Sequence, residues 1–124
     1  LPFMDWRQLP AVIAGLDINL MPLENSLFHW CKSENKWTEA ALVKVPSVMS
    51  RNCEMEYVVE NGKDGWMCTT KEEWVNALEA LVTDEKARKA MGEAAHQKVM
   101  EHYLTVNTGK DAMEELLCSE SYTK

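Results

Sequence analysis

Four residues near the middle of the chain have the types and spacing of an anion site followed by a sugar site. Ser33 is a good helix N-cap, so we expect a helix over residues 34–44. The first backbone N–H groups of such a helix have no partner within it; they belong to Glu34, Asn35 and Lys36. These amides, with the Lys36 ammonium, suit a phosphate. Glu39 lies one turn further on the same face, where its carboxylate can accept two hydrogen bonds from a ribose diol.

The same residues also fit a plainer interpretation. Lys36 and Glu39 stand three positions apart, which is the spacing of an ordinary ion pair on a solvated helix. The residues alone therefore leave two readings open: a phosphate and sugar site, or a charged helix face.

Two further segments could border a ligand, because ligands of open α/β sheets bind beyond the carboxyl ends of strands. The loop Leu23–Ser33 carries unusual residues for a solvated connection, namely Phe28, His29, Trp30 and Cys31. Trp30 is a candidate for stacking on a ligand or for closing over it. The turn after the strand expected at 45–50 contains Arg51 and Asn52 and is the second, poorer candidate.

Composition limits the partners. The 124-residue chain has 20 acidic and 13 basic side chains and a net charge of −7, which argues against nucleic acid as the main partner. No apolar run approaches the roughly 20 residues that span a bilayer, so we expect no transmembrane segment. The cysteines stand at irregular intervals, and we expect reduced thiols and no metal site. They are Cys31, Cys53, Cys68 and Cys118.

Strands and helices are expected to alternate along the chain. The expected strands are 17–22, 45–50 and 66–68, and the expected helices include 6–14, 34–44, 72–82 and about 106–118. A further helix, capped by Thr83 or Asp84, is expected over the apolar repeat from Ala87 to Val99. Asp5 should cap the first helix, and Thr70 with Glu73 forms a capping box before the third. Such alternation predicts an α/β fold, a three-layer Rossmann-like parallel sheet flanked by helices. Because few strands are visible, either the sheet is small or part of it is missing.

Three segments in a fixed order carry a family resemblance: "DINLMP", "SENKWTEAALVKVPSVMS" and "VVENGKDGWMC", followed by "TDEKARKAMGEAAHQKVMEHY". This order resembles the carboxyl-terminal half of retaining glycosyltransferases of the GT-B fold, in the large family 4. The residues at matching places are Asp17, Pro22, Glu39, Ala40, Pro46, Ser50, Gly62 and Gly65. The resemblance implies that residues 1–124 are a single domain, the later part of a donor-binding domain, and hence a partial GT-B carboxyl-terminal domain.

The resemblance also implies roles for single residues. Glu39 matches the second glutamate of the E-x7-E pair, which holds the ribose hydroxyls of the nucleotide donor. The turn that receives the donor diphosphate matches the backbone amides near Glu34, Asn35 and Lys36. Phe3 falls near the loop that contacts the nucleobase. Neither a metal nor another cofactor is implied, since the nucleotide-diphosphate sugar is a substrate.

The chain departs from the family pattern at several places. The first glutamate of the pair, which contacts the donor sugar in many members, falls on Cys31. A thiol cannot replace a charged acceptor, so donor-sugar contact by Cys31 and its neighbour Trp30 is open. The family's usual glycine before "x-P" is Lys44, and "SENK" has no glycine. The Arg and Lys that neutralise the diphosphate in the family belong to an upstream segment.

These observations predict part of a retaining glycosyltransferase of the hexosyltransferase type. It would move a sugar from a nucleotide diphosphate to a glycan or lipid-linked acceptor, in bacterial surface polysaccharide synthesis. The chain alone is expected to be inactive. The alternative is a non-catalytic α/β interaction or assembly module derived from such a domain, which Cys31 and Lys44 favour.

The remaining expectations concern neighbours and location. The last helix, about 106–118, should pack back toward a missing amino-terminal domain, and two copies of the isolated chain could pair through the surface that this domain would cover. The expected location is the cytoplasm. For the intact protein, a peripheral position at the inner membrane is the alternative.

Overall fold

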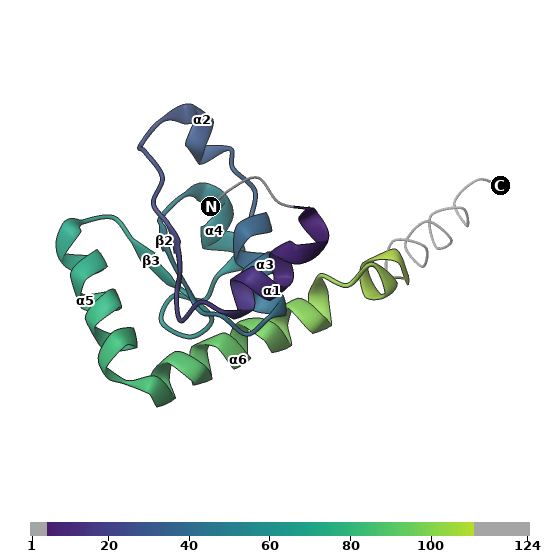
Figure 1. Ribbon diagram of the computed structural model, residues 1–124. Helices are drawn as coiled ribbons and strands as arrows, with labels where there is room; N and C mark the ends of the chain where they lie inside the picture. The colour runs from purple at the N-terminus through teal and green to yellow at the C-terminus, as the bar shows by residue number, and fades with distance from the viewer. Residues whose placement is uncertain (1–4, 111–124) are drawn as a thin grey trace.

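The computed structural model describes residues 5–110, and three parallel strands form its centre (Figure 1). The strands are β1 (Asn19–Met21), β2 (Ser47–Ser50) and β3 (Trp66–Cys68). The larger helices are α3 (Asn35–Leu42), α5 (Lys71–Thr83) and α6 (Glu85–His102). The shorter ones are η1 (Trp6–Gln8), α1 (Leu9–Ala14), α2 (Leu27–Trp30) and α4 (Cys53–Val58). Phe3, Cys118 and residues 111–118 of the expected last helix lie outside the described residues.

The sheet has the order β1-β2-β3, and its register aligns three methionines in one row. Met21 pairs with Met49, and Met49 pairs with Met67. All three are buried, because side chains at the same level of neighbouring strands point to the same face. Each expected strand segment contains the strand that the structure shows.

Helices cover both faces of this sheet. The methionine row packs in one core cluster with Trp37 and Ala41 of α3, residues of α4, and Ala95 and Val99 of α6. On the opposite face, Val48 and Cys68 pack against α5 and the first half of α6 in a second cluster. The prediction of a three-layer α/β fold with a parallel sheet is therefore confirmed.

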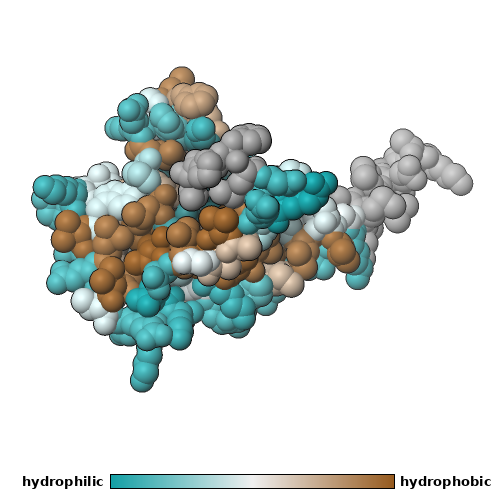
Figure 2. Space-filling view, viewed as in Figure 1, coloured by the Kyte–Doolittle hydropathy of each residue, from teal (hydrophilic) through white to brown (hydrophobic). Residues whose placement is uncertain are grey.

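The strand β1 is an edge strand among the described residues, and it carries an exposed apolar side chain, Leu20. Leu20 pairs with Val48 in the register, so it points to the face that α5 covers. α5 leaves Leu20 about half exposed, at 51%. Figure 2 shows apolar residues gathered across this side of the molecule and at the tip that carries α2.

The turn that follows α3 packs closely against α6. Lys44 has a φ of 62°, a left-handed conformation that favours glycine. The family pattern has a glycine at the position of Lys44, and the backbone here does adopt the conformation that favours glycine. A Cβ added at Gly92 would overlap the Lys44 carbonyl oxygen, so only glycine lets α6 approach this turn. The Lys44 ammonium lies 2.8 Å from a Glu93 carboxylate oxygen.

Two local predictions were wrong. Ser33 does not cap α3, since the helix begins one residue later with Glu34 at the N-cap position and no side-chain cap. The loop Leu23–Ser33 contains the short helix α2, which Ser26 caps. By contrast, the capping box of Thr70 and Glu73 is confirmed.

Candidate functional site

A cavity of about 260 Å³ lies at the carboxyl ends of all three strands. The loop after β1, the turn after β2 and the end of β3 each contribute to its wall. The lining residues are Leu23, Glu24, Asn25, His29, Trp30, Ser50, Arg51, Asn52, Cys53, Glu56, Cys68 and Thr69. The structure thus brings together the loop and the turn that the sequence offered as separate candidates.

Ser50 joins the two halves of this wall. Its Oγ accepts a hydrogen bond from the Leu23 backbone N–H at 2.8 Å and lies 3.1 Å from the Leu23 carbonyl oxygen, to which it donates. The exit of β1 is therefore fixed to the end of β2. Ser50 matches the family pattern, but its structural task depends on a partner 27 residues away, which the sequence does not reveal.

The turn after β2 supplies one cation and one spare donor. Arg51 Nη1 lies 3.1 Å from Glu56 Oε1, and both side chains are partly exposed. Asn52 caps α4, because its Oδ1 accepts the Met55 N–H at 2.8 Å. Asn52 is 4% exposed, and its Nδ2 has no hydrogen-bond partner among residues 5–110. Buried donors without partners are rare, so this amide calls for an acceptor.

Cys68, the last residue of β3, is buried and lines the cavity. Burial raises the pKa of its thiol, and the nearby Glu73 carboxylate raises it further. Cys68 is therefore a neutral thiol that adds no charge to the wall. Within the described residues the cysteines are free thiols.

The helix α2 stands out at one end of the molecule (Figure 1), and its residues border two hollows. Trp30 borders the cavity, and its Nε1 donates to Asn25 Oδ1 at 2.7 Å. Cys31 borders a second, open hollow on α2, whose other lining residues are Leu27, Phe28, Lys32 and Ser33. The two donor-sugar candidates of the sequence, although adjacent in the chain, thus line different hollows.

The start of α3 is open, as the anion-site prediction requires. The Glu34 carbonyl accepts the Trp37 and Thr38 N–H groups, while the amides of Asn35 and Lys36 have no partner among the described residues. Glu39 is exposed on the same helix. No ion pair joins Lys36 and Glu39 in the described chain, so the pair expected by the plainer interpretation is absent.

The start of α3 does not border the cavity. Glu34, Asn35, Lys36 and Glu39 are all absent from its lining. Instead, the Lys36 carbonyl accepts a hydrogen bond from Asn19 Nδ2 at 3.3 Å, which places the first turn of α3 beside β1. The structure therefore separates the predicted phosphate and ribose residues from this cavity.

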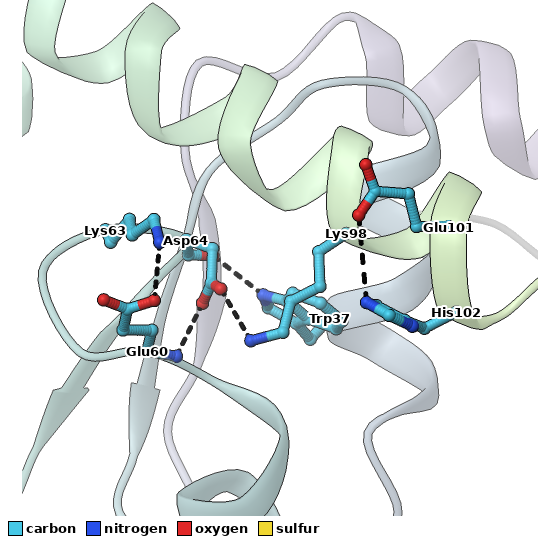
Figure 3. Close-up of polar contacts among 7 residues, drawn as sticks. All are labelled: Trp37, Glu60, Lys63, Asp64, Lys98, Glu101 and His102. Atoms are coloured by element: carbon cyan, nitrogen blue, oxygen red, sulfur yellow. Dashed lines mark hydrogen bonds and ion pairs between the residues drawn. The ribbon is translucent and has the colours of Figure 1, made fainter.

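A buried network of hydrogen bonds and one ion pair connects α3 to α6 (Figure 3). Trp37 is fully buried, and its Nε1 donates to the Asp64 carbonyl oxygen at 2.9 Å. The Asp64 carboxylate accepts the Glu60 N–H at 2.8 Å and lies 2.8 Å from the Lys98 ammonium. The loop that carries Asp64 thus holds α3 and α6 in place.

Two other kinds of site were searched for in the described part of the chain. Residues 5–110 contain no group of three or more His, Cys, Asp or Glu side chains placed to hold a metal ion. Over the same range, no helix has the length and apolarity needed to cross a membrane.

Known proteins resemble the chain in sequence pattern and in fold. Residues 2–115 match the family model described as glycosyl transferase-like. The crystal structure of the C-terminal domain of LpcC, a group 1 family glycosyl transferase from Francisella tularensis, superposes with a TM-score of 0.62 at 18% identity. The match covers 83% of this chain and 52% of that domain, so the chain spans about half its length. No curated protein matches the chain.

Proposed function

Because the chain belongs to the glycosyl transferase-like family, we propose that it forms part of the donor-binding domain of a retaining glycosyltransferase. The intact enzyme moves a sugar from a nucleotide diphosphate to a glycan or lipid-linked acceptor. The observation that carries this proposal is the uncapped start of α3, followed one turn later by the exposed carboxylate of Glu39.

The donor's diphosphate binds at the start of α3. The free amides of Asn35 and Lys36 point their partial positive charge at the anion, and the Lys36 ammonium adds a full charge. Glu39 accepts hydrogen bonds from the ribose hydroxyls. Catalysis in such a site comes from positioning the donor and from stabilising the departing diphosphate.

The donor's sugar lies on the Cys31 side of α2. The hollow that Cys31 lines includes Ser33, which directly precedes the helix start. Trp30 faces the other hollow, so it does not share that position. Cys31 presents an exposed thiol where a carboxylate would accept sugar hydroxyls, and backbone groups must supply those contacts.

The rest of the donor-binding domain packs beside β1. The exposed Leu20 and the outer edge of β1, which pairs with no other strand among residues 5–110, provide an apolar side chain and backbone groups for this contact. The chain's match to about half of a solved C-terminal domain supports this arrangement. We place the intact enzyme in bacterial surface polysaccharide synthesis, at the cytoplasmic side of the membrane.

Calorimetric titration of the full-length protein with UDP, GDP and ADP tests the proposal. One nucleoside diphosphate should bind, and Glu39→Ala should weaken it by about 1.5–3 kcal/mol, or roughly 10- to 150-fold. Glu79→Ala removes an exposed carboxylate from α5 and should leave the affinity unchanged. Equal affinities for Glu39→Ala and the unaltered protein would refute the role of Glu39, and binding of none of the nucleotides would favour the non-catalytic module.

A further inference from the structure

We propose that Asp64, in its ion pair with Lys98, is a positioning residue for the phosphate site at the start of α3. The pair acts through Trp37, the residue that directly follows the two amides of that site. That the site binds a phosphate rests on the proposed function. How the pair orients the site can be measured without any nucleotide, so the two proposals can fail independently.

The first turn of α3 has little support of its own. Its N-cap residue, Glu34, makes no side-chain cap, and only the Glu34 carbonyl accepts N–H groups of the helix, those of Trp37 and Thr38. Asn19 adds one hydrogen bond to the Lys36 carbonyl at 3.3 Å, which is longer than usual. Helices in proteins owe most of their stability to tertiary packing, so packing must set the direction of the free amides.

Trp37 is the residue that fixes this turn. It directly follows Lys36, and its side chain is fully buried. The indole Nε1 donates to the Asp64 carbonyl oxygen at 2.9 Å, and the ring meets Tyr103 edge to face, with the centroids 5.9 Å apart. A buried indole that is held both at its polar end and along its ring has little freedom to move. A shift of Asp64 would therefore turn the backbone that carries the free amides.

Asp64 is held in turn by its own carboxylate (Figure 3). One carboxylate oxygen accepts the Glu60 N–H at 2.8 Å, and the other accepts from the Lys98 ammonium at 2.8 Å. The Asp64 side chain is 4% exposed, and among residues 5–110 no other carboxylate belongs to a buried residue. The loop whose carbonyl binds Trp37 is thus tied to one point on α6.

Stability alone gives little reason for a buried charge pair at this place. Removing two charges from water costs free energy that their attraction only partly restores, so apolar side chains of the same shape often support a fold equally well. An ion pair with fixed hydrogen bonds instead specifies one geometry. The geometry specified here is that of the loop that contacts Trp37 and, through Trp37, that of the start of α3.

Two variants weaken the pair and preserve the rest of the loop. Asp64→Asn keeps an oxygen for the Glu60 N–H but turns an N–H group toward the Lys98 ammonium. Lys98→Met removes the ammonium from the other side, and Lys98→Arg keeps the charge. Thr70→Ala is the matched control, because it destabilises the start of α5 and leaves α3 unaltered.

Chemical shifts of the isotope-labelled full-length protein, recorded without nucleotide, give the first readout. Asp64→Asn and Lys98→Met should both shift the indole N–H signal of Trp37 and the amide signals of Asn35 and Lys36. Thr70→Ala should shift none of them, although it also lowers stability. Unchanged signals of these three residues in both pair variants would overturn the proposal.

Calorimetric titration with UDP, GDP and ADP gives the second readout. Asp64→Asn and Lys98→Met should each lower the affinity for the nucleotide that the unaltered protein binds by about fivefold or more, while Thr70→Ala should not. Lys98→Arg should restore part of the affinity that Lys98→Met loses. Unchanged affinity in both pair variants, or an equal loss in Thr70→Ala, would overturn the positioning role.

The two readouts also separate this proposal from the proposed function. If the unaltered protein binds none of the three nucleotides, the proposed nucleotide site is refuted, and the shifts recorded without nucleotide still decide whether the pair orients the start of α3. If a nucleotide binds with equal affinity to the unaltered protein and to Asp64→Asn and Lys98→Met, the nucleotide site stands and the positioning role is refuted.

Discussion

The starts of α5 and α3 differ in whether a side chain caps them. At α5, Thr70 Oγ1 accepts the Glu73 N–H, and Glu73 Oε2 accepts the N–H groups of Thr69 and Thr70. At α3, no side chain caps the helix, and the Trp37 N–H donates to the Glu34 carbonyl oxygen instead. The first two amides of each helix have no partner among the described residues: Asn35 and Lys36 in α3, and Lys71 and Glu72 in α5. A helix start that is capped by its own side chains stabilises the fold, whereas an open one is available to an anion.

The open start of α3 needs support from elsewhere in the fold. Trp37 and Asp64 connect the first turns of α3 to Lys98 of α6. At the other end, Gly92 allows α6 to touch the turn at Lys44. The contrast therefore predicts that α3 depends on distant contacts for its stability, while α5 depends on its own cap.

The largest loss of stability should come from Gly92→Ala. The added Cβ overlaps the Lys44 carbonyl, so α6 must move away from α3, at a cost of about 3 kcal/mol. Gly109→Ala is the control, because a Cβ there meets nothing within 4 Å. Urea unfolding should show no loss of stability for Gly109→Ala. A similar free energy of unfolding for the two variants would contradict the close contact between Gly92 and the Lys44 carbonyl.

A smaller loss is expected from Asp64→Ala. The change leaves the Glu60 N–H and the Lys98 ammonium without their buried acceptor, which should lower the free energy of unfolding by about 2 kcal/mol. Glu60→Ala breaks the exposed pair with Lys63 instead and should cost nothing measurable. Thermal unfolding compares them, and equal melting temperatures would mean that the buried network does not hold α3.

Thr70→Ala should have a still smaller effect, confined to stability. It removes the acceptor of the Glu73 N–H and should cost about 1 kcal/mol in chemical unfolding. Nucleotide affinity should not change, since α5 is not the phosphate site. If Thr70→Ala lowered nucleotide affinity as well as stability, the assignment of the α5 start to stability and the α3 start to binding would be wrong.

The smallest effect concerns pH. Hydrogen bonds from the Thr69 and Thr70 amides hold the pKa of Glu73 below its usual value of 4.5. The unfolded chain therefore binds the proton more readily, so the stabilisation is complete above about pH 4.5 and is lost as the pH falls through the lowered value. Melting temperatures of the unaltered protein and Glu73→Gln should converge in acid, and a constant difference between them would contradict this linkage.

The sequence predicted features that depend on neighbouring residues. The capping box at Thr70 and Glu73 spans four residues, and the strand at 66–68 is a short apolar run after a polar turn, so both were found correctly. The start of α3 was predicted one residue early, because Ser33 has the right type but the chain leaving α2 does not turn at it. α2 itself is only four residues long, too short for a periodic signal.

Features that depend on distant partners escaped prediction. The cavity exists because Ser50 binds Leu23, and the support of α3 exists because Asp64 meets both Trp37 and Lys98. Neither pair has a sequence signal, since the contacts form only when the sheet has assembled. The same holds for Gly92, because its close approach to the Lys44 carbonyl appears only in the structure.

Amide chemical shifts measured during a nucleoside diphosphate titration test the central claim most directly. When UDP, GDP or ADP is added to the labelled full-length protein, the account predicts shifts of the Asn35 and Lys36 amides and none of the Lys71 and Glu72 amides at the start of α5. Equal shifts at both helix starts, or none at Asn35 and Lys36, would contradict it.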